Sequence, residues 1–397
     1  MGGAGAGSVR GDVTMKYIMA VGLWMVAIGT CQVVTLPQQV EEREEVSASE
    51  LFGPDALTVM TRSLSTGVAL ERVLGAPTAA ELPARTAEAF EALRRADLST
   101  RARRLADEIQ YARPHLIGLQ QVAEVRLQSP GDSIFGGTRP AEALYLDVLP
   151  VLLGELEARG LHYREVARVR NADVELPLLA SAAPSFDDVR VTDFDIILAR
   201  ADVDVSGVRA GNYLARRELR RADLGPVDLP RGWASVVATV KGRTYRFVST
   251  HLEPAPDEAG LRVQLAQTEE LLASLRRESL PVVLVGDFNT PANLGLMGAP
   301  TYRELLLAGY VDVWTRRMGQ AAWGNAAEAS LGMPTLEERL NLVLVRHPVT
   351  AVPRRLGPVQ AYVVGGSLGE PRFGPWQSEL SGVVARLRMP LAASVRN

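Results

Sequence analysis

Two short polar segments each follow an apolar run that has the character of a buried strand. Residues 249–253 (Ser-Thr-His-Leu-Glu) end the run Tyr245 to Thr250, and residues 286–290 (Gly-Asp-Phe-Asn-Thr) follow Val282 to Val285. Polar residues at strand ends are where a sheet usually presents its chemistry. His251 and Asp287 can exchange protons, and Asp287 and Asn289 offer oxygen ligands. We therefore take these three residues as candidate catalytic residues.

The same residues have simpler interpretations. Asp287 and Asn289 can stabilise a tight turn at a strand end by hydrogen bonding to the local backbone. His251, which lies close to Glu253 in the sequence, can be a structural histidine. Asn212, after Gly211, can either line a pocket loop or form a plain turn.

The elements around these segments alternate between strands and helices. Lys241-Gly242-Arg243-Thr244 joins 236–240 to 245–250 as a β-hairpin, and a helix with Leu261, Leu265, Thr268, Leu272 and Leu275 on one face leads to the strand at 282–285. We expect further strands at 57–60, 116–119, 196–199, 342–345 and 383–387, and helices at 82–112 and 144–156. Pro150 must begin a new helix or kink the second. Hairpins mixed with helices favour packed mixed sheets with outer helices.

Composition limits the class of protein. The 397 residues are 47% hydrophobic, enough for a large core, and 43 basic against 46 acidic residues give a net charge of −3. Such a balance makes a nonspecific nucleic-acid binder an unfavoured interpretation. The single cysteine excludes a disulfide framework within the chain and a cysteine-rich zinc site, and four histidines leave little material for a histidine-based metal site.

Six ordered motifs resemble the endonuclease/exonuclease/phosphatase superfamily, which has the DNase I-like fold. Besides the two segments above, the resemblance lies in residues 57–64 (LTVMTRSL), 119–122 (LQQV), 339–342 (RLNL) and 378–384 (SELSGVV). It extends over about Leu57 to Arg388. The resemblance implies an α/β protein: a four-layer α/β sandwich with two packed central mixed β-sheets and outer helices. It also implies hydrolysis of a phosphate ester by water beside one or two Mg²⁺ ions.

The sequence departs from the family pattern at the positions that carry that chemistry. Ser63 stands where the family usually has Asn, Gln121 replaces the metal-binding Glu, and Asn341 replaces the Asp that orients the catalytic histidine. The closing Ser-Asp-His motif has Glu379 and Leu380 in place of Asp and His. A leucine moves no proton, and losing a positioned acid or base typically costs about 10²–10⁴ in rate. The sequence thus predicts that the hydrolytic site is degraded.

Three functional interpretations follow. The first is a repurposed site without a cofactor, in which His251 and Asp287 perform acid–base chemistry such as cyclisation or isomerisation, or bind a small molecule. The second is a surviving Mg²⁺-dependent phosphodiesterase with rearranged ligands at Asp287, Glu379 and Glu124. The third is an extracytoplasmic interaction module without a working site. Nucleic acid is not an expected partner, and the sequence does not indicate an oligomeric state.

The N-terminal region predicts export. Residues 17–40 contain no charge, Ile18 to Ile28 is apolar and Lys16 precedes it, as in a signal peptide whose start is Met1 or Met15. Cys31 follows a weak lipobox-like segment, and the run 17–36 is also suited to a membrane anchor. We expect a leader and acidic linker at 1–45, one domain at 46–397, and an extracellular or membrane-anchored location.

Overall fold

The computed structural model describes residues 56–64, 70–180, 185–221, 225–292, 295–316, 339–348, 357, 359–365 and 382–388. The expectations for the leader, for Cys31 and for the boundary after residue 45 lie outside these residues. Among the described helices, none has the length and apolarity needed to cross a membrane.

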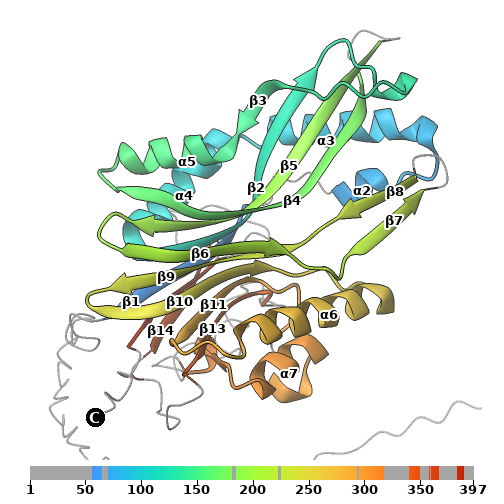
Figure 1. Cartoon of the computed structure of the whole chain (residues 1–397). Coiled ribbons are helices and arrows are strands. Elements are labelled where there is room, and N and C mark those ends of the chain that lie inside the picture. The colour runs from blue at the N-terminus through green and yellow to red at the C-terminus, as the bar shows by residue number, and fades with distance from the viewer. Residues whose placement is uncertain are drawn as a thin grey trace, which may run out of the picture. The chain divides into compact units, whose positions relative to one another are not determined.

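Two mixed β-sheets form the centre of the domain (Figure 1). The first, as far as the structure describes it, has the spatial order β14 (Val359–Val364), β15 (Gly382–Leu387), β1 (Leu57–Ser63), β2 (Leu116–Gln128), β5 (Phe186–Arg200) and β4 (Tyr163–Leu179), with β3 (Ala143–Asp147) paired to β2. The second has the order β12 (Val311–Asp312), β13 (Asn341–Arg346), β11 (Val282–Asp287), β10 (Arg243–His251), β9 (Gly232–Val240) and β6 (Asp204–Asn212). A separate ribbon pairs β7 (Arg217–Arg221) with β8 (Gly225–Leu229).

The sheets pack face to face through alternating apolar side chains. Val59, Ile197 and Val383 of the first sheet share one buried cluster with Val236, Phe247 and Val285 of the second. Strand β11 is buried along its whole length, as a central strand with two covered faces must be. This inner layer fixes the sheets relative to each other, and therefore fixes the strand ends that carry the polar residues.

Helices cover both outer faces. Helices α4 (Leu98–Ala112) and α5 (Val148–Glu157) pack on the first sheet, and α6 (Glu258–Leu275) and α7 (Pro300–Leu307) pack on the second. Helices α2 (Leu70–Leu74) and α3 (Leu82–Arg95) cover the far part of β4 and β5. The predicted four-layer α/β sandwich with outer helices is confirmed.

Three local predictions need correction. The helix expected at 82–112 is two helices, because Asp97 adopts a left-handed conformation (φ 41°) and its side chain caps α4 by accepting from Thr100 N at 3.1 Å. The helix expected at 144–156 begins as strand β3, and α5 starts at Val148 with Pro150 in its first turn, where no backbone N–H is needed. The hairpin turn is confirmed, with positive φ at Lys241 and Gly242.

The third correction concerns α6. Of the predicted face, Thr268 and Leu275 are buried, but Leu261, Leu265 and Leu272 are only partly buried. Gln264 and Gln267 are buried in addition. The reason is that both amides hydrogen-bond to backbone groups of distant segments. Periodicity of apolar residues alone does not reveal such partners.

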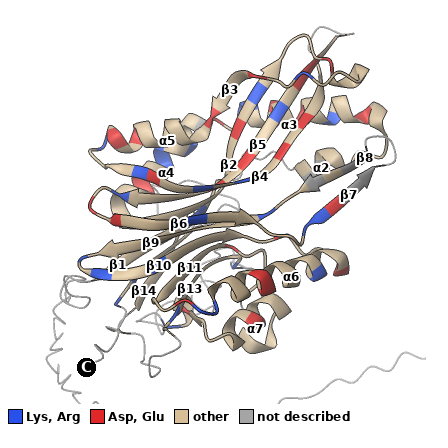
Figure 2. Ribbon diagram, in the orientation of Figure 1, with Lys and Arg blue, Asp and Glu red and all other residues tan. Residues whose placement is uncertain are grey.

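Charged residues of both signs are interspersed on the described strands. Figure 2 shows blue and red segments alternating along β2, β4 and β5. Many are paired, for example Arg168 with Glu165 and Arg190 with Asp173, both at 2.6 Å.

Candidate active site

The strand ends bring most of the predicted residues together. His251 ends β10, Asp287 ends β11 and Asn341 begins β13, and the three are register neighbours across the second sheet. Ser63 ends β1 of the first sheet, opposite Gln120 of β2. These predicted residues therefore lie at strand ends of the two sheets.

Gln121 lies in a bulge of β2. The register of β2 against β5 shifts between Leu119 and Val122, and Gln121 has a positive φ of 58°. This conformation directs its backbone N–H to Asp195 Oδ1 at 3.2 Å, and its side-chain Oε1 accepts from Ser63 Oγ at 2.7 Å. Ser63 and Gln121, two of the positions at which this sequence departs from the family pattern, are thus hydrogen-bonded to each other.

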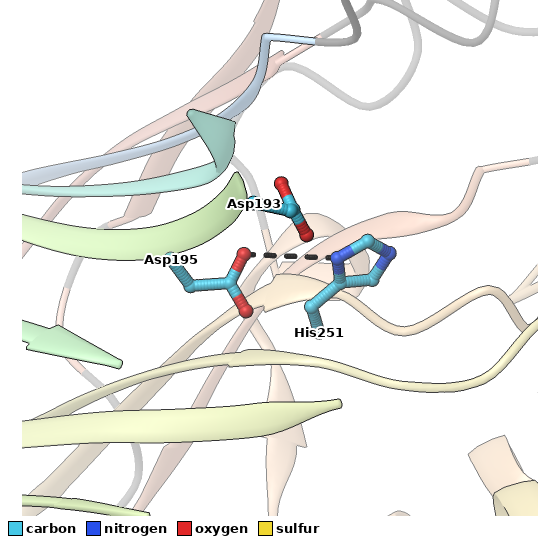
Figure 3. Close-up of side chains that lie close together, drawn as sticks. All are labelled: Asp193, Asp195 and His251. Atoms are coloured by element: carbon cyan, nitrogen blue, oxygen red, sulfur yellow. Dashed lines mark ion pairs between the residues drawn. The ribbon is translucent and has the colours of Figure 1, made fainter. Parts of the chain in front are cut away.

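Asp193, Asp195 and His251 form a compact cluster. Figure 3 shows the three side chains pointing toward one another, and one ligand-type atom from each lies within 4.8 Å of the others. Asp195 Oδ1 lies 3.7 Å from His251 Nδ1, and the two side chains are 0% and 2% exposed. A buried carboxylate beside a histidine ring is an arrangement that orients the ring and stabilises its protonated form.

A fixed cation lies against this cluster. Arg231 Nη1 is 3.4 Å from both ring nitrogens of His251, and Arg231 Nε is 3.4 Å from Glu253 Oε2. Arg231 and Glu253 are both buried. The charge of the aspartates is therefore balanced in part by a guanidinium that belongs to the protein.

Two groups of the cluster have pKa values shifted upward. Burial raises the pKa of Asp193 to about 7, and the carboxylate of Asp195 adds to this rise. For His251, burial and the charge of Arg231 lower the pKa, but the contact with Asp195 and the charge of Asp287 outweigh them and raise it above its usual value. Near neutral pH the cluster can therefore both donate and accept a proton.

Asn289 and Asn212, two of the predicted asparagines, donate to backbone carbonyl groups. Asn289 N donates to Asp287 Oδ1 at 3.0 Å and stabilises the strand-end turn, and Asn289 Nδ2 donates to Leu252 O at 2.7 Å and connects this turn to the end of β10. Asn212 Nδ2 donates to Arg170 O at 2.9 Å and lies 3.4 Å from Asn171 Oδ1. Asn171 in turn lies 3.5 Å from Asp193 Oδ2, which connects Asn212 to the cluster only indirectly.

Other candidates do not join the site. The hypothesis that Glu124 reaches back through a helical turn is wrong, because β2 continues as a strand through Glu124, which forms an ion pair with Arg126. Glu379 and Leu380 lie outside the described residues, so their expected roles stay predictions. His115 is buried, and its Nδ1 accepts from the backbone N–H of Thr58, which lies 57 residues away in the sequence. Burial lowers the pKa of His115 to about 4.

Close approach of two strands holds His251 and Asp287 beside each other. Gly286 has a φ of +152°, and a Cβ atom there would lie 1.9 Å from the carbonyl oxygen of Thr250. No residue with a side chain fits at this position without moving the strands apart.

Sequence reasoning missed Asp193, Asp195 and Arg231. A signal for the aspartates exists, because they stand at i and i+2 directly before the apolar run Ile196 to Ala199, and residues two apart on a strand point to the same face. The direction of that face depends on the pairing of β5 with the bulged part of β2, which the sequence does not reveal.

The model of the Endonuclease/Exonuclease/phosphatase family matches residues 89–367. The chain therefore belongs to the endonuclease/exonuclease/phosphatase family. No curated protein matches the sequence.

The chain is similar to several solved structures. An endonuclease/exonuclease/phosphatase from Beutenbergia cavernae is 20% identical, with a TM-score of 0.51 over 84% of this chain and 72% of that chain. TDP2 from D. rerio, complexed with a single strand DNA product, is 16% identical, with a TM-score of 0.43 over 84% of this chain and 99% of that chain. A family protein from Bacteroides thetaiotaomicron is 15% identical, with a TM-score of 0.44 over 85% and 98% of the two chains.

The family usually depends on Mg²⁺, an ion that requires oxygen ligands in near-octahedral geometry. The described residues do not fit that site. Gln121 is neutral and its Oε1 accepts from Ser63, while the acidic cluster contributes an imidazole nitrogen and lies beside the Arg231 guanidinium. A cation at 3.4 Å from the imidazole opposes the binding of a second cation there.

Proposed function

We propose that the hydrolytic site of this family member has become a metal-independent acid–base site, which acts on a small uncharged molecule. The observation that supports it best is the set of partners around Asp195. Its Oδ1 accepts from Gln121 N and faces His251 Nδ1, with the carboxylate fully buried. A titratable histidine oriented by a buried carboxylate is a recurrent arrangement for proton transfer.

The chemistry that we assign is a proton relocation within one substrate. Asp193, with its pKa near neutrality, takes a proton from the substrate, and protonated His251, held by Asp195, returns a proton to another atom. One proton leaves and one is returned, so isomerisation or cyclisation of this kind balances without an oxidant, a reductant or a water molecule. Arg231 and Asp287 set the charge around the imidazole.

The test is a thermal titration of the full chain with Mg²⁺ and with Mn²⁺, run beside a hydrolysis assay on DNA and on bis(p-nitrophenyl) phosphate. We expect no rise in melting temperature at millimolar metal and no metal-dependent hydrolysis. A site occupied at about 100 times its Kd would add about 2.7 kcal/mol of stability, which amounts to several degrees. A rise of that size, together with hydrolysis that His251→Ala abolishes, would contradict the proposal.

A second candidate function is a metal-dependent phosphodiesterase with a rearranged ligand set. It is favoured by the short separation of the Asp193, Asp195 and His251 ligand atoms and by Asp195 Oδ2, which has no hydrogen-bond partner among the described residues. Two carboxylates and an imidazole would suit Mn²⁺ better than Mg²⁺. A Mn²⁺-dependent thermal shift that disappears in Asp195→Asn would select this candidate.

For the location, we propose export through residues 17–36, either as a cleaved signal or as an anchor, with Cys31 as a lipid attachment site. Sequencing the N-terminus of the mature protein and comparing Cys31→Ser with the unchanged chain test this directly. An uncleaved chain in the soluble cytoplasmic fraction would contradict it.

A further inference from the structure

Helix α6 buries two glutamines where an amphipathic helix normally buries apolar residues. Gln264 is 1% exposed and Gln267 is 0% exposed. A buried amide without hydrogen-bond partners destabilises the fold. Burial of two such side chains on a helix beside the candidate site therefore requires specific partners, and the structure shows them.

Gln264 connects the segments that follow two adjacent strands. Its Nε2 donates to Glu253 O at 2.7 Å, just after β10, and to Asn289 O at 2.9 Å, just after β11. Its Oε1 accepts from Thr301 Oγ1 at 2.6 Å, at the start of α7. One side chain thus fixes the distance between the backbone that follows His251 and the backbone that follows Asp287.

Gln267 also hydrogen-bonds to the backbone of Glu253. Its Oε1 accepts from Glu253 N at 2.8 Å, and its Nε2 donates to Ala215 O at 3.0 Å, in the segment after β6. Both backbone polar groups of Glu253 are therefore bound by α6. The side chain of Glu253 contacts Arg231, and Arg231 contacts the ring of His251.

We propose that Gln264 and Gln267 are positioning residues, which hold Glu253 and Asn289 in place and thereby fix the surroundings of His251. In Figure 1, α6 lies along the outer side of the second sheet, and its contacts reach the ends of β10 and β11. The proposal concerns the geometry of the site and holds whichever chemistry the site performs. Failure of the acid–base proposal in the metal titration would leave it unaffected.

The matched control is Thr268, on the same helix. Thr268 is 1% exposed, but its Oγ1 donates only to Gln264 O, 2.8 Å away within α6. Thr268→Val therefore removes a buried hydrogen bond without touching a strand-end segment. Gln264→Met and Gln267→Met keep the length of the side chain and remove its hydrogen bonds.

The first measurement is the pH titration of the histidine ring nitrogens by heteronuclear NMR on the full chain, in which His251→Gln identifies the His251 signal among four histidines. We expect Gln264→Met to shift the pKa of His251 by at least about half a unit and Thr268→Val to leave it unchanged. If Gln264→Met fails to fold, Gln264→Glu takes its place, since it retains the acceptor for Thr301 and loses the amide donor.

The second measurement is amide hydrogen exchange. We expect the Glu253 amide to exchange at least about tenfold faster in Gln267→Met than in Thr268→Val, because the acceptor of that N–H is lost. The proposal is overturned if both glutamine variants give the His251 titration and the Glu253 exchange rate of Thr268→Val. In that case the glutamines would contribute to stability alone.

Discussion

Strand β5 carries two buried aspartates with different surroundings, Asp188 near the start of the strand and Asp195 at the candidate site. Asp188 and Asp195 are both 0% exposed. Asp188 Oδ2 accepts from Asp132 N at 2.7 Å and from Ser133 N at 3.0 Å, and its Oδ1 accepts from the Ser133 hydroxyl. Asp195 instead shares Oδ1 between Gln121 N and the His251 ring, and Oδ2 has no hydrogen-bond partner among the described residues.

The difference shows how partner chemistry separates a structural carboxylate from one suited to a site. Backbone amides and a hydroxyl do not change charge in the physiological pH range, so Asp188 holds the 131–133 segment in one state. Histidine does change charge in that range, so the environment of Asp195 has more than one protonation state. Asp188 and Asp195 are thus the same residue type on the same strand with the same burial, and they differ in their hydrogen-bond partners.

The largest change in activity is expected from restoring the family residues at the five positions where the sequence departs from the family pattern. A chain with Ser63→Asn, Gln121→Glu, Asn341→Asp, Glu379→Asp and Leu380→His should gain Mg²⁺-dependent hydrolysis of bis(p-nitrophenyl) phosphate. A positioned acid or base contributes about 10²–10⁴ in rate, so we expect a gain of at least about 100-fold over the unchanged chain. EDTA should remove the gain. Equal rates in both chains would show that these side chains are not what limits hydrolysis.

Near the start of β5, Asp188→Ala should lower the free energy of unfolding by about 3 kcal/mol. Three donors of the 132–133 segment lose their acceptor, and two of them are backbone N–H groups. Urea unfolding followed by circular dichroism measures the change. Asp187→Ala, on the neighbouring and partly buried residue, is the control and should cost less than about 1 kcal/mol. A similar small cost for Asp188→Ala would remove the contrast between Asp188 and Asp195.

Asp193→Asn should stabilise the protein at high pH. The folded-state pKa of Asp193 is raised, so the folded protein retains a proton that the unfolded chain loses, and stability falls as pH rises from about 4 to about 7. The variant lacks this loss. We expect it to be more stable than the unchanged chain by about 4 kcal/mol at pH 8 and nearly equal at pH 4. Urea unfolding at the two pH values gives the comparison, and a difference independent of pH would contradict it.

The smallest effect is expected for Asp195→Asn. Loss of the carboxylate removes the contact that favours the protonated ring, so the pKa of His251 should fall. NMR titration of the ring nitrogens measures it. Asp188→Asn, near the start of the same strand, should leave that pKa unchanged. A fall in both variants would mean that His251 responds to general loosening of β5.

The fold was predictable because it depends on motifs and periodicities that are local in sequence. The hairpin at Lys241 and Gly242 and the buried strand before Asp287 match the structure. The prediction was wrong at 143–147, because a strand and a helix of similar apolar composition follow each other there. The residues before Pro150 are as apolar as the helix that follows, and only pairing with β2 makes 143–147 a strand.

The site was predictable only in part. His251 and Asp287 were found because they stand at strand ends, and Asn341 was found through the family resemblance. The register of β10, β11 and β13 places the three side by side. Asp193 and Asp195 were missed because their role depends on a bulge in another strand. The partners of Gln264 and Gln267 lie in segments 11 to 52 residues away in sequence, which helical periodicity does not encode.

Gly286 limits how this protein can be redesigned. Because a single added carbon there would collide with the Thr250 carbonyl oxygen at 1.9 Å, the gap between the last residues of β10 and β11 is set by the backbone itself. A redesign for a larger ligand therefore requires substitutions on the first sheet, around Ser63 and Gln121. The spacing of β10 and β11 in the second sheet cannot be changed by a side chain at position 286.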